Sequence, residues 1–225
     1  IGAIARLVLN GNMITNYGKD LSGLTALCDV LPALKNPISL ELANCNLKVA
    51  EVNELARAMA AGAAVEAIAI GGNPITSAGG ATLLETIKTS KLKTIDIGKP
   101  LPLQEPYDSD TLDLSKTGMD PGHIVILSWW LATPAAGAVD VVNVSHNPIG
   151  VDGAKALAAV LPGSSLKCLI IGPRSTRLPV NDAEVTELNF EGQDFTALEV
   201  TLVAAAVSTM GAVEAVDLAK SKLGG

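Results

Sequence analysis

Apolar residues recur along the chain in short groups with the same internal spacing. In each group an aliphatic residue is followed, after two positions, by an apolar–x–apolar triplet and then, three residues later, by a small polar residue that is often asparagine. Such a triplet has the period of two that a β-strand with one buried face requires. The sequence therefore predicts about nine short strands, in groups that begin at or near Ile4, Pro37, Val65, Leu92, Leu112, Val139, Leu166, Val185 and Val213.

The segments that follow several of these triplets have the period of a helix. From Gly150 to Leu161, apolar residues recur at steps of three and four, which places them on one face of a helix. Asp152 stands where an acidic residue favours a helix start, and Pro162 follows where a helix would end. The same pattern predicts helices that include residues 52–59, 83–87, 121–131 and 203–207.

The strand group, written L-x-x-L-x-L-x-x-N-x-L, resembles the leucine-rich repeat, and the copies cover almost the whole chain. Their spacing, with a helix in most units, is similar to that of the ribonuclease-inhibitor-like subclass. The resemblance implies an α/β fold: a leucine-rich-repeat solenoid, or horseshoe, with a parallel sheet on the concave side and helices on the convex side. We expect one domain over residues 1–225, part of a longer or a processed chain, because the sequence begins with Ile1-Gly2 rather than with Met and ends with Gly224-Gly225.

The asparagine after each triplet is expected to hydrogen-bond the backbone of its own turn and of the neighbouring unit. Cys45 takes the asparagine position in the second unit. Two units depart from the pattern, because proline-rich segments at 99–109 and 173–184 stand where helices are expected. These units lie about 75 residues apart, which indicates a duplicated block of three repeats. We expect both segments to be irregular loops, either contact surfaces or shortened connectors.

Composition narrows the possible functions. The 225 residues are 48% hydrophobic and only 3% aromatic, with a net charge of −7. This hydrophobicity excludes a disordered chain, and the acidic balance argues against nucleic acid as a partner. No apolar run reaches the roughly 18 residues of a membrane span, so no membrane insertion is expected. Three widely spaced cysteines predict reduced, buried thiols and a cytoplasmic protein.

No pattern of catalytic or metal-binding residues is present, so the sequence predicts no enzyme activity, no cofactor and no metal. His123 is expected to have a structural role at a helix start, and His146 to lie in a solvated turn. Trp130 is expected to be partly buried. Trp129 is expected to face outward, as an anchor for a partner, or to pack on a neighbouring helix.

The residue in the middle of each triplet points away from the core. These positions and their flanks carry six acids and one base, Arg6, so the concave face would suit a basic protein partner, or would be a solvated face that aids solubility. Asp96 and Asp113 are expected at the same register on adjacent strands, where like charges cost stability. The candidate partner-binding residues are Glu41, Asp96, Asp113, Asn143, Glu187, Asn189, Glu191 and Asp217 on the strands, with Trp129 on a helix.

The family resemblance implies a protein–protein interaction scaffold that binds its partner through this acidic face and the two loops. Two alternatives stay open: a regulator of small GTPases of the Ran-activating type, and a structural subunit of a larger assembly. Neither end of the chain has an evident polar cap, and repeat arrays need such caps. We therefore also expect self-association through the ends.

Overall fold

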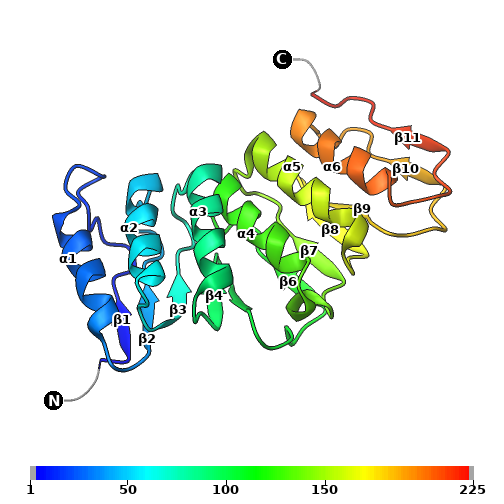
Figure 1. Ribbon diagram of the computed structural model, residues 1–225. Helices are drawn as coiled ribbons and strands as arrows, with labels where there is room; N and C mark the ends of the chain where they lie inside the picture. Colours follow the sequence, from blue (N-terminus) through cyan, green and yellow to red (C-terminus); the bar gives the residue numbers. More distant parts are fainter. Residues whose placement is uncertain (1–3, 223–225) are drawn as a thin grey trace.

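The computed structural model describes residues 4–222, so the expectations that concern residues 1–3 and 223–225 lie outside the described part. Strands and helices alternate along the chain, and the helices stand side by side in sequence order along a bent row (Figure 1). The α-helices are α1 (Ser22–Val30), α2 (Val49–Ala60), α3 (Thr76–Thr89), α4 (Pro121–Leu131), α5 (Gly150–Val160) and α6 (Ala197–Val207). The predicted helices therefore form where the apolar period indicates them.

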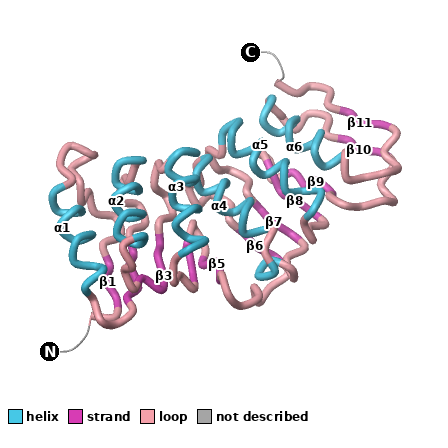
Figure 2. Tube along the Cα trace, in the orientation of Figure 1, coloured by secondary structure: helices cyan, strands magenta, loops and turns pink. Residues whose placement is uncertain are grey.

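Each of the nine predicted triplets forms a strand. These strands are β1 (Arg6–Val8), β2 (Ile38–Glu41), β3 (Val65–Ala69), β4 (Thr94–Asp96), β6 (Thr111–Asp113), β7 (Val141–Asn143), β8 (Cys168–Ile171), β10 (Glu187–Asn189) and β11 (Ala215–Asp217). Short 3-10 turns follow three of the helices, at Leu31–Ala33, Pro134–Ala136 and Leu161–Gly163. Figure 2 shows the helices along one side of the row and the strands along the other.

Burial alternates along the strands as the triplets predict. In β2, Ile38 and Leu40 are buried whereas Ser39 and Glu41 are only partly covered. The buried strand residues meet the apolar faces of the helices in one hydrophobic core that runs the length of the row. Each of these strands has only three to five residues, so its buried face is covered by the helices and by neighbouring strands.

Asparagine side chains join neighbouring units, as predicted. Asn73 accepts hydrogen bonds from the backbone amides of Cys45 and Leu47, and it donates to the carbonyl oxygens of Leu42 and Ile70. Asn147 makes the equivalent bonds to the turn at 117–119 and to Leu114. Cys45, at the asparagine position of its unit, donates through Sγ to the Leu9 carbonyl at 3.0 Å. It thus keeps the backward bond and a longer bond to the Ala43 carbonyl oxygen at 3.5 Å, but not the bonds that Asn73 accepts from backbone amides.

The sequence predicts irregular loops for the two proline-rich segments, and this is wrong in part, because each segment contains an added strand. β5 (Pro100–Pro102) runs antiparallel to β4, and β9 (Thr176–Pro179) runs antiparallel to β8. Tight turns at Gly98 and at 172–175 reverse the chain, and both Gly98 and Ser175 adopt positive φ angles there. Hairpins form because each turn has only a few residues and is followed by residues in which buried and exposed side chains alternate, as in a strand.

These hairpins interrupt the single parallel sheet that the sequence predicts. Strands β1–β5, β6–β9 and β10–β11 form three separate sheets in which all pairs are parallel except the two hairpins. Directly after β5, the amide of Leu103 donates to the carbonyl oxygen of Lys93. Because backbone groups alternate along a strand, those of residues 100 and 102 point away from β4. Both are prolines without an N–H, so the outer edge of β5 cannot donate to β6.

Helices α3 and α4 pack directly on each other across the first interruption, because the unit between them has no helix. Gly80 and Gly122 permit the close approach. A Cβ on Gly80 would lie 2.6 Å from the Cα of Gly122, and one on Gly122 would overlap the carbonyl oxygen of Thr76. Backbone therefore meets backbone where side chains would otherwise separate the two helices.

We predict that Gly122→Ala lowers the free energy of unfolding by about 1–3 kcal/mol, because the added methyl forces α3 and α4 apart. The matched control is Gly23→Ala in α1, where a Cβ would meet nothing within 4 Å. That change should be neutral or stabilising by up to about 1 kcal/mol, because alanine favours helix. Urea denaturation of the three proteins gives the comparison; equal stability of both variants would contradict the close contact.

Candidate partner-binding surface

The strand face carries two adjoining hollows in the first sheet. The first, of about 290 Å³, lies across β2, β3 and β4, and the second, of about 430 Å³, lies beside the β4–β5 hairpin. They share Thr94 and Pro100. The first is lined by Asn10, Ser39, Glu41, Ala43, Ala67, Ile68, Ala69, Thr94, Asp96 and Pro100, and the second also by Pro102, Pro106, Tyr107 and Asp108.

Small residues on β3 form the floor of the first hollow. The register aligns Glu41, Ala69 and Asp96 side by side on β2, β3 and β4. Adjacent strands lie about 4.8 Å apart, so the two carboxylates stand on either side of the short alanine side chain. Of the predicted acids, the structure brings Glu41 and Asp96 to one hollow.

Glu41 is held in place by intramolecular contacts. Its Oε1 lies 2.5 Å from Arg6 Nε, and its Oε2 accepts a hydrogen bond from Asn10 Nδ2 at 2.9 Å. The Arg6 bond is the main reason that the pKa of Glu41 is lowered from its ordinary value. The ion pair is largely exposed, so it orients the carboxylate rather than contributing much stability. Arg6 lies opposite Ser39 in the strand register, so it reaches Glu41 diagonally, two residues along β2.

Several predicted face residues have a local backbone role. The side chains of Asp96, Asp113, Asn143, Asn189 and Asp217 each accept a hydrogen bond through Oδ1 from the amide two residues later. Such bonds satisfy a backbone donor where the chain leaves the strand. The frequency of Asp and Asn in the middle of the triplets therefore has a structural cause, apart from any partner.

One expectation about charge on this face is wrong. Asp96 and Asp113 do not lie on paired strands, because β5 adds to β4 and Asp113 belongs to the next sheet, opposite Asn143. Two lysines outside the triplet positions also approach acids of this face. Lys220 pairs with Glu191, and Lys99 contributes, after the hydrogen bonds from Ser115, to lowering the pKa of Asp113.

The other predicted acids are divided between regions. Asn189 and Asp217 pair across β10 and β11, and Glu187 is exposed at the start of β10. Within residues 4–222, Asp96, Asp113, Glu187 and Asp217 form no ion pair. The first sheet combines the carboxylates of Glu41 and Asp96 with two adjoining hollows on the strand face, so we take this region as the candidate surface.

The two tryptophans lie away from this face, in α4. Trp130 is fully buried rather than partly buried, and its Nε1 donates to the carbonyl oxygen of Pro102 at 2.7 Å. Its ring meets Tyr107 edge to face, with ring centroids 5.7 Å apart. Trp129 is half-buried and packs against the core, so it does not extend the strand surface. Sequence analysis missed Tyr107, which Trp130 positions beside the second hollow.

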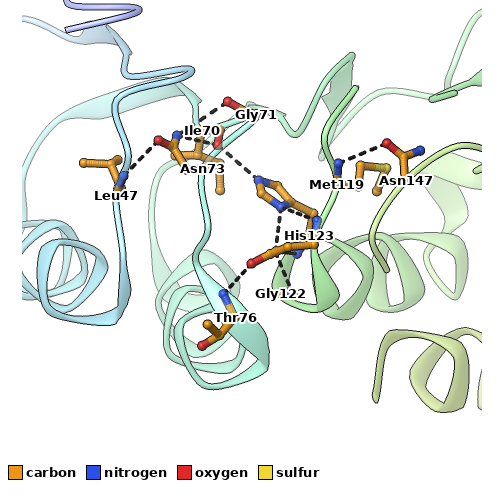
Figure 3. A network of polar contacts seen from close by, with 10 residues as sticks. Leu47, Ile70, Gly71, Asn73, Thr76, Met119, Gly122, His123 and Asn147 are labelled. Carbon is orange, nitrogen blue, oxygen red and sulfur yellow. Dashed lines mark hydrogen bonds and ion pairs between the residues drawn. The ribbon is translucent and has the colours of Figure 1, made fainter. Parts of the chain in front are cut away.

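His123 has the structural role that the sequence predicts, in a buried network at the start of α4 (Figure 3). Its Nε2 lies 3.1 Å from the carbonyl oxygen of Ile70, which can only accept, so Nε2 carries a proton. Its Nδ1 lies 2.8 Å from Asp120 Oδ1. Asp120 also accepts from the amides of Gly122 and Thr76, and thereby caps α4 and contacts α3.

The remaining candidate chemistry is limited. Among residues 4–222, no three His, Cys, Asp or Glu side chains gather closely enough to hold a metal ion. Cys28, Cys45 and Cys168 are free and buried, and burial raises the pKa of Cys28 to about 11. His146 is exposed, as predicted. None of the helices in the described part of the chain has the length and hydrophobicity that crossing a membrane requires.

Comparison with known proteins adds no relative: no protein-family model and no curated protein matches this chain.

Asp120 predicts a pH-dependent loss of stability. Burial raises its pKa, but hydrogen bonds from His123 and Thr76 outweigh burial and hold the pKa below the ordinary value. Its stabilising contribution is therefore present above about pH 4, the unfolded value, and is lost as the pH falls through the folded pKa. We predict that Asp120→Asn costs about 1–2 kcal/mol at pH 7 and much less near pH 2.

Urea denaturation at both pH values measures this difference. Asp152→Asn is the control, because Asp152 is an exposed first-turn acid of α5. It should change stability by less than about 0.5 kcal/mol at either pH. An Asp120→Asn penalty that is equal at the two pH values would show that the charge contributes nothing.

Proposed function

We propose that this protein is a leucine-rich-repeat protein of the ribonuclease-inhibitor-like type, which binds another protein rather than catalysing a reaction. Three features support the assignment: strands at all nine triplets, helices on the opposite side of the row, and asparagine bonds between units. The hairpins at β5 and β9 are departures within such an array. Free, buried thiols are compatible with the reducing cytoplasm, where we place the protein.

The pair of hollows on the first sheet carries the binding proposal. Glu41, Asp96 and Asp108 contribute carboxylates to their walls, while Ala67 and Ala69 keep the floor low. A partner segment that lies across β2–β4 would place basic side chains between Glu41 and Asp96 and an apolar side chain beside Tyr107. We therefore propose a basic, extended segment of another protein as the ligand, attracted by the acidic face.

We predict that Asp96→Asn combined with Asp108→Asn weakens binding of a labelled peptide of alternating lysine and alanine at least fivefold. Asparagine can still accept the Gly98 bond that Asp96 accepts, so the strand end stays intact. Fluorescence anisotropy at two salt concentrations measures the affinity, and the variant should also show a weaker dependence on salt.

The control removes the same charge from the helix side, through Glu85→Gln combined with Asp152→Asn, both of which are exposed. This control should bind the peptide like the unchanged protein. If both double variants lose the same affinity, the peptide responds to net charge alone and the strand-face site is wrong.

A second proposal, self-association, rests on the first unit. An apolar hollow of about 370 Å³ lies between β1 and α1, lined by Leu7, Leu9, Ile14, Gly23, Leu24 and Leu27. Nearby, the side chains of Val8, Met13 and Tyr17 are about half exposed. An apolar surface of this kind favours association with another protein surface, and we propose a second copy.

We predict that Leu27→Glu shifts the protein toward the monomer in sedimentation velocity over a range of concentrations. Val151→Glu is the control, because Val151 is an exposed apolar residue on α5, far along the row from this hollow. It should leave the association unchanged. A protein that is monomeric at every concentration before any substitution contradicts the proposal.

A further inference from the structure

A cavity of about 250 Å³ lies where the start of α6 faces the turns that follow β7 and β8. A water molecule occupies about 30 Å³ of the liquid, so the space is larger than a single water requires. It is separate from the two hollows of the strand face, with which it shares no residue. Its lining residues are Val144, His146, Asn147, Ile149, Ile171, Gly172, Pro173, Leu198 and Glu199.

The duplicated first half shows how the equivalent space is filled there. Five lining residues, Val144, Asn147, Ile149, Ile171 and Gly172, correspond to Ile70, Asn73, Ile75, Ile97 and Gly98 about 75 positions earlier. Leu198 and Glu199 at the start of α6 correspond to Gly122 and His123 at the start of α4. In the first half, the imidazole of His123 reaches the Ile70 carbonyl oxygen (Figure 3).

The cavity has a cause in the sequence. Gly80 and Gly122, which let α3 and α4 touch, are replaced by Ala154 and Leu198 in α5 and α6. The larger side chains keep the two helix backbones apart. No imidazole is available to fill the gap, because Glu199 stands in the place of His123 and turns back to its own helix start.

Glu199 gives the cavity its chemistry. Glu199 is only 7% exposed. Its Oε2 accepts hydrogen bonds from Thr196 N at 2.8 Å and from Thr196 Oγ1 at 2.6 Å. Its Oε1 accepts no hydrogen bond from residues 4–222. Glu51, at the same place in α2, uses both oxygens, because Thr15 Oγ1 donates to its Oε1 at 2.9 Å.

The carbonyl oxygen of Val144 is a second open acceptor. It accepts from Asn147 Nδ2 at 3.0 Å. Its counterpart, the Ile70 carbonyl oxygen, accepts from Asn73 Nδ2 and also from His123 Nε2. The second half thus keeps these acceptors and lacks the imidazole donor, and its carboxylate is that of Glu199 instead of Asp120, whose cap position Thr196 takes. Glu199 Oε1 is not fully covered by protein, so solvent or a ligand in the cavity must supply its partner.

We propose that this cavity is a binding site for a guanidinium group. A guanidinium is planar, remains cationic at any physiological pH and has only donors, so it can bond Glu199 Oε1 and the Val144 carbonyl oxygen together. It takes the place that the His123 side chain occupies in the first half. The guanidinium could belong to an arginine of a partner protein or to a free small molecule, and the experiment distinguishes these sources.

The test is an NMR titration of the isotope-labelled protein with methylguanidinium at pH 8. Amide signals of Gly172, Leu198 and Glu199 should shift and saturate at millimolar concentrations. N-methylurea, a neutral molecule of similar shape, should bind at least tenfold more weakly. Glu199→Gln should weaken methylguanidinium binding at least tenfold, and it keeps the capping box because glutamine also serves at that position.

Glu199→His gives an independent check that does not depend on loss of folding. The histidine can repeat the bonds of His123 to the cap amide and to the carbonyl oxygen, but not its contact with a carboxylate, because Thr196 takes the place of Asp120. The variant should therefore stay folded while methylguanidinium binding disappears. Saturable binding of N-acetyl-arginine methylamide would assign the site to an arginine of a partner, and binding of methylguanidinium alone would assign it to a small molecule. The absence of saturable shifts in the unchanged protein, or equal binding by Glu199→Gln, overturns the proposal.

Discussion

The hydrogen bonds between neighbouring units are the interaction on which the rest of this structure depends. A strand of three residues, such as β1 or β7, cannot satisfy its own backbone, and its buried side chains cover little area. Each strand therefore relies on the next one for backbone partners, and the turns rely on amides such as Asn73 and Asn147. Where Cys45 replaces the asparagine, the backward bond is kept by a thiol. The units are stable only as a stack.

The two hairpins change how that dependence is met. Because β5 and β9 end their sheets, no ladder of backbone bonds joins the flanking units, and the helices must supply the contact. In the first half this contact is tight, through Gly80, Gly122 and the bonds of Asp120 and His123. In the second half, Leu198 and Glu199 occupy the matching positions and a cavity is left. The same arrangement of turns and helix start thus occurs twice, once with the space occupied by the His123 side chain and once with a cavity. The difference arises from a few side chains at the helix start.

Much of the fold could be predicted from the sequence, because the period of two in the triplets and the helical period are local signals. The strands at all nine triplets and the helices from α2 to α6 follow from them. The hairpins could not, because the proline at 100 gives a local reason to end a helix but does not indicate a return to β4. Because the first hairpin was not predicted, Asp113 was expected beside Asp96, whereas it lies in the next sheet. The candidate surface was predicted in part: Glu41 and Asp96 were found, whereas Tyr107 depends on Trp130 packing from a distant helix. The cavity needs the spacing of two helices, which no residue pattern reveals.

The proline edge of β5 has a consequence for how the molecule opens. Cooperative unfolding spreads through shared backbone bonds, and none is shared between β5 and β6 or between β9 and β10. The strand amides therefore belong to three groups, one for each sheet, which are linked through helix packing and through side-chain bonds such as those of Asp120 and of Arg174 with Asp194. The last group contains only two strands, and Val216 on β11 is exposed. Local openings will begin there and stop at the two hairpins, where the sheets end, so the chain behaves as three coupled folding units within one continuous core.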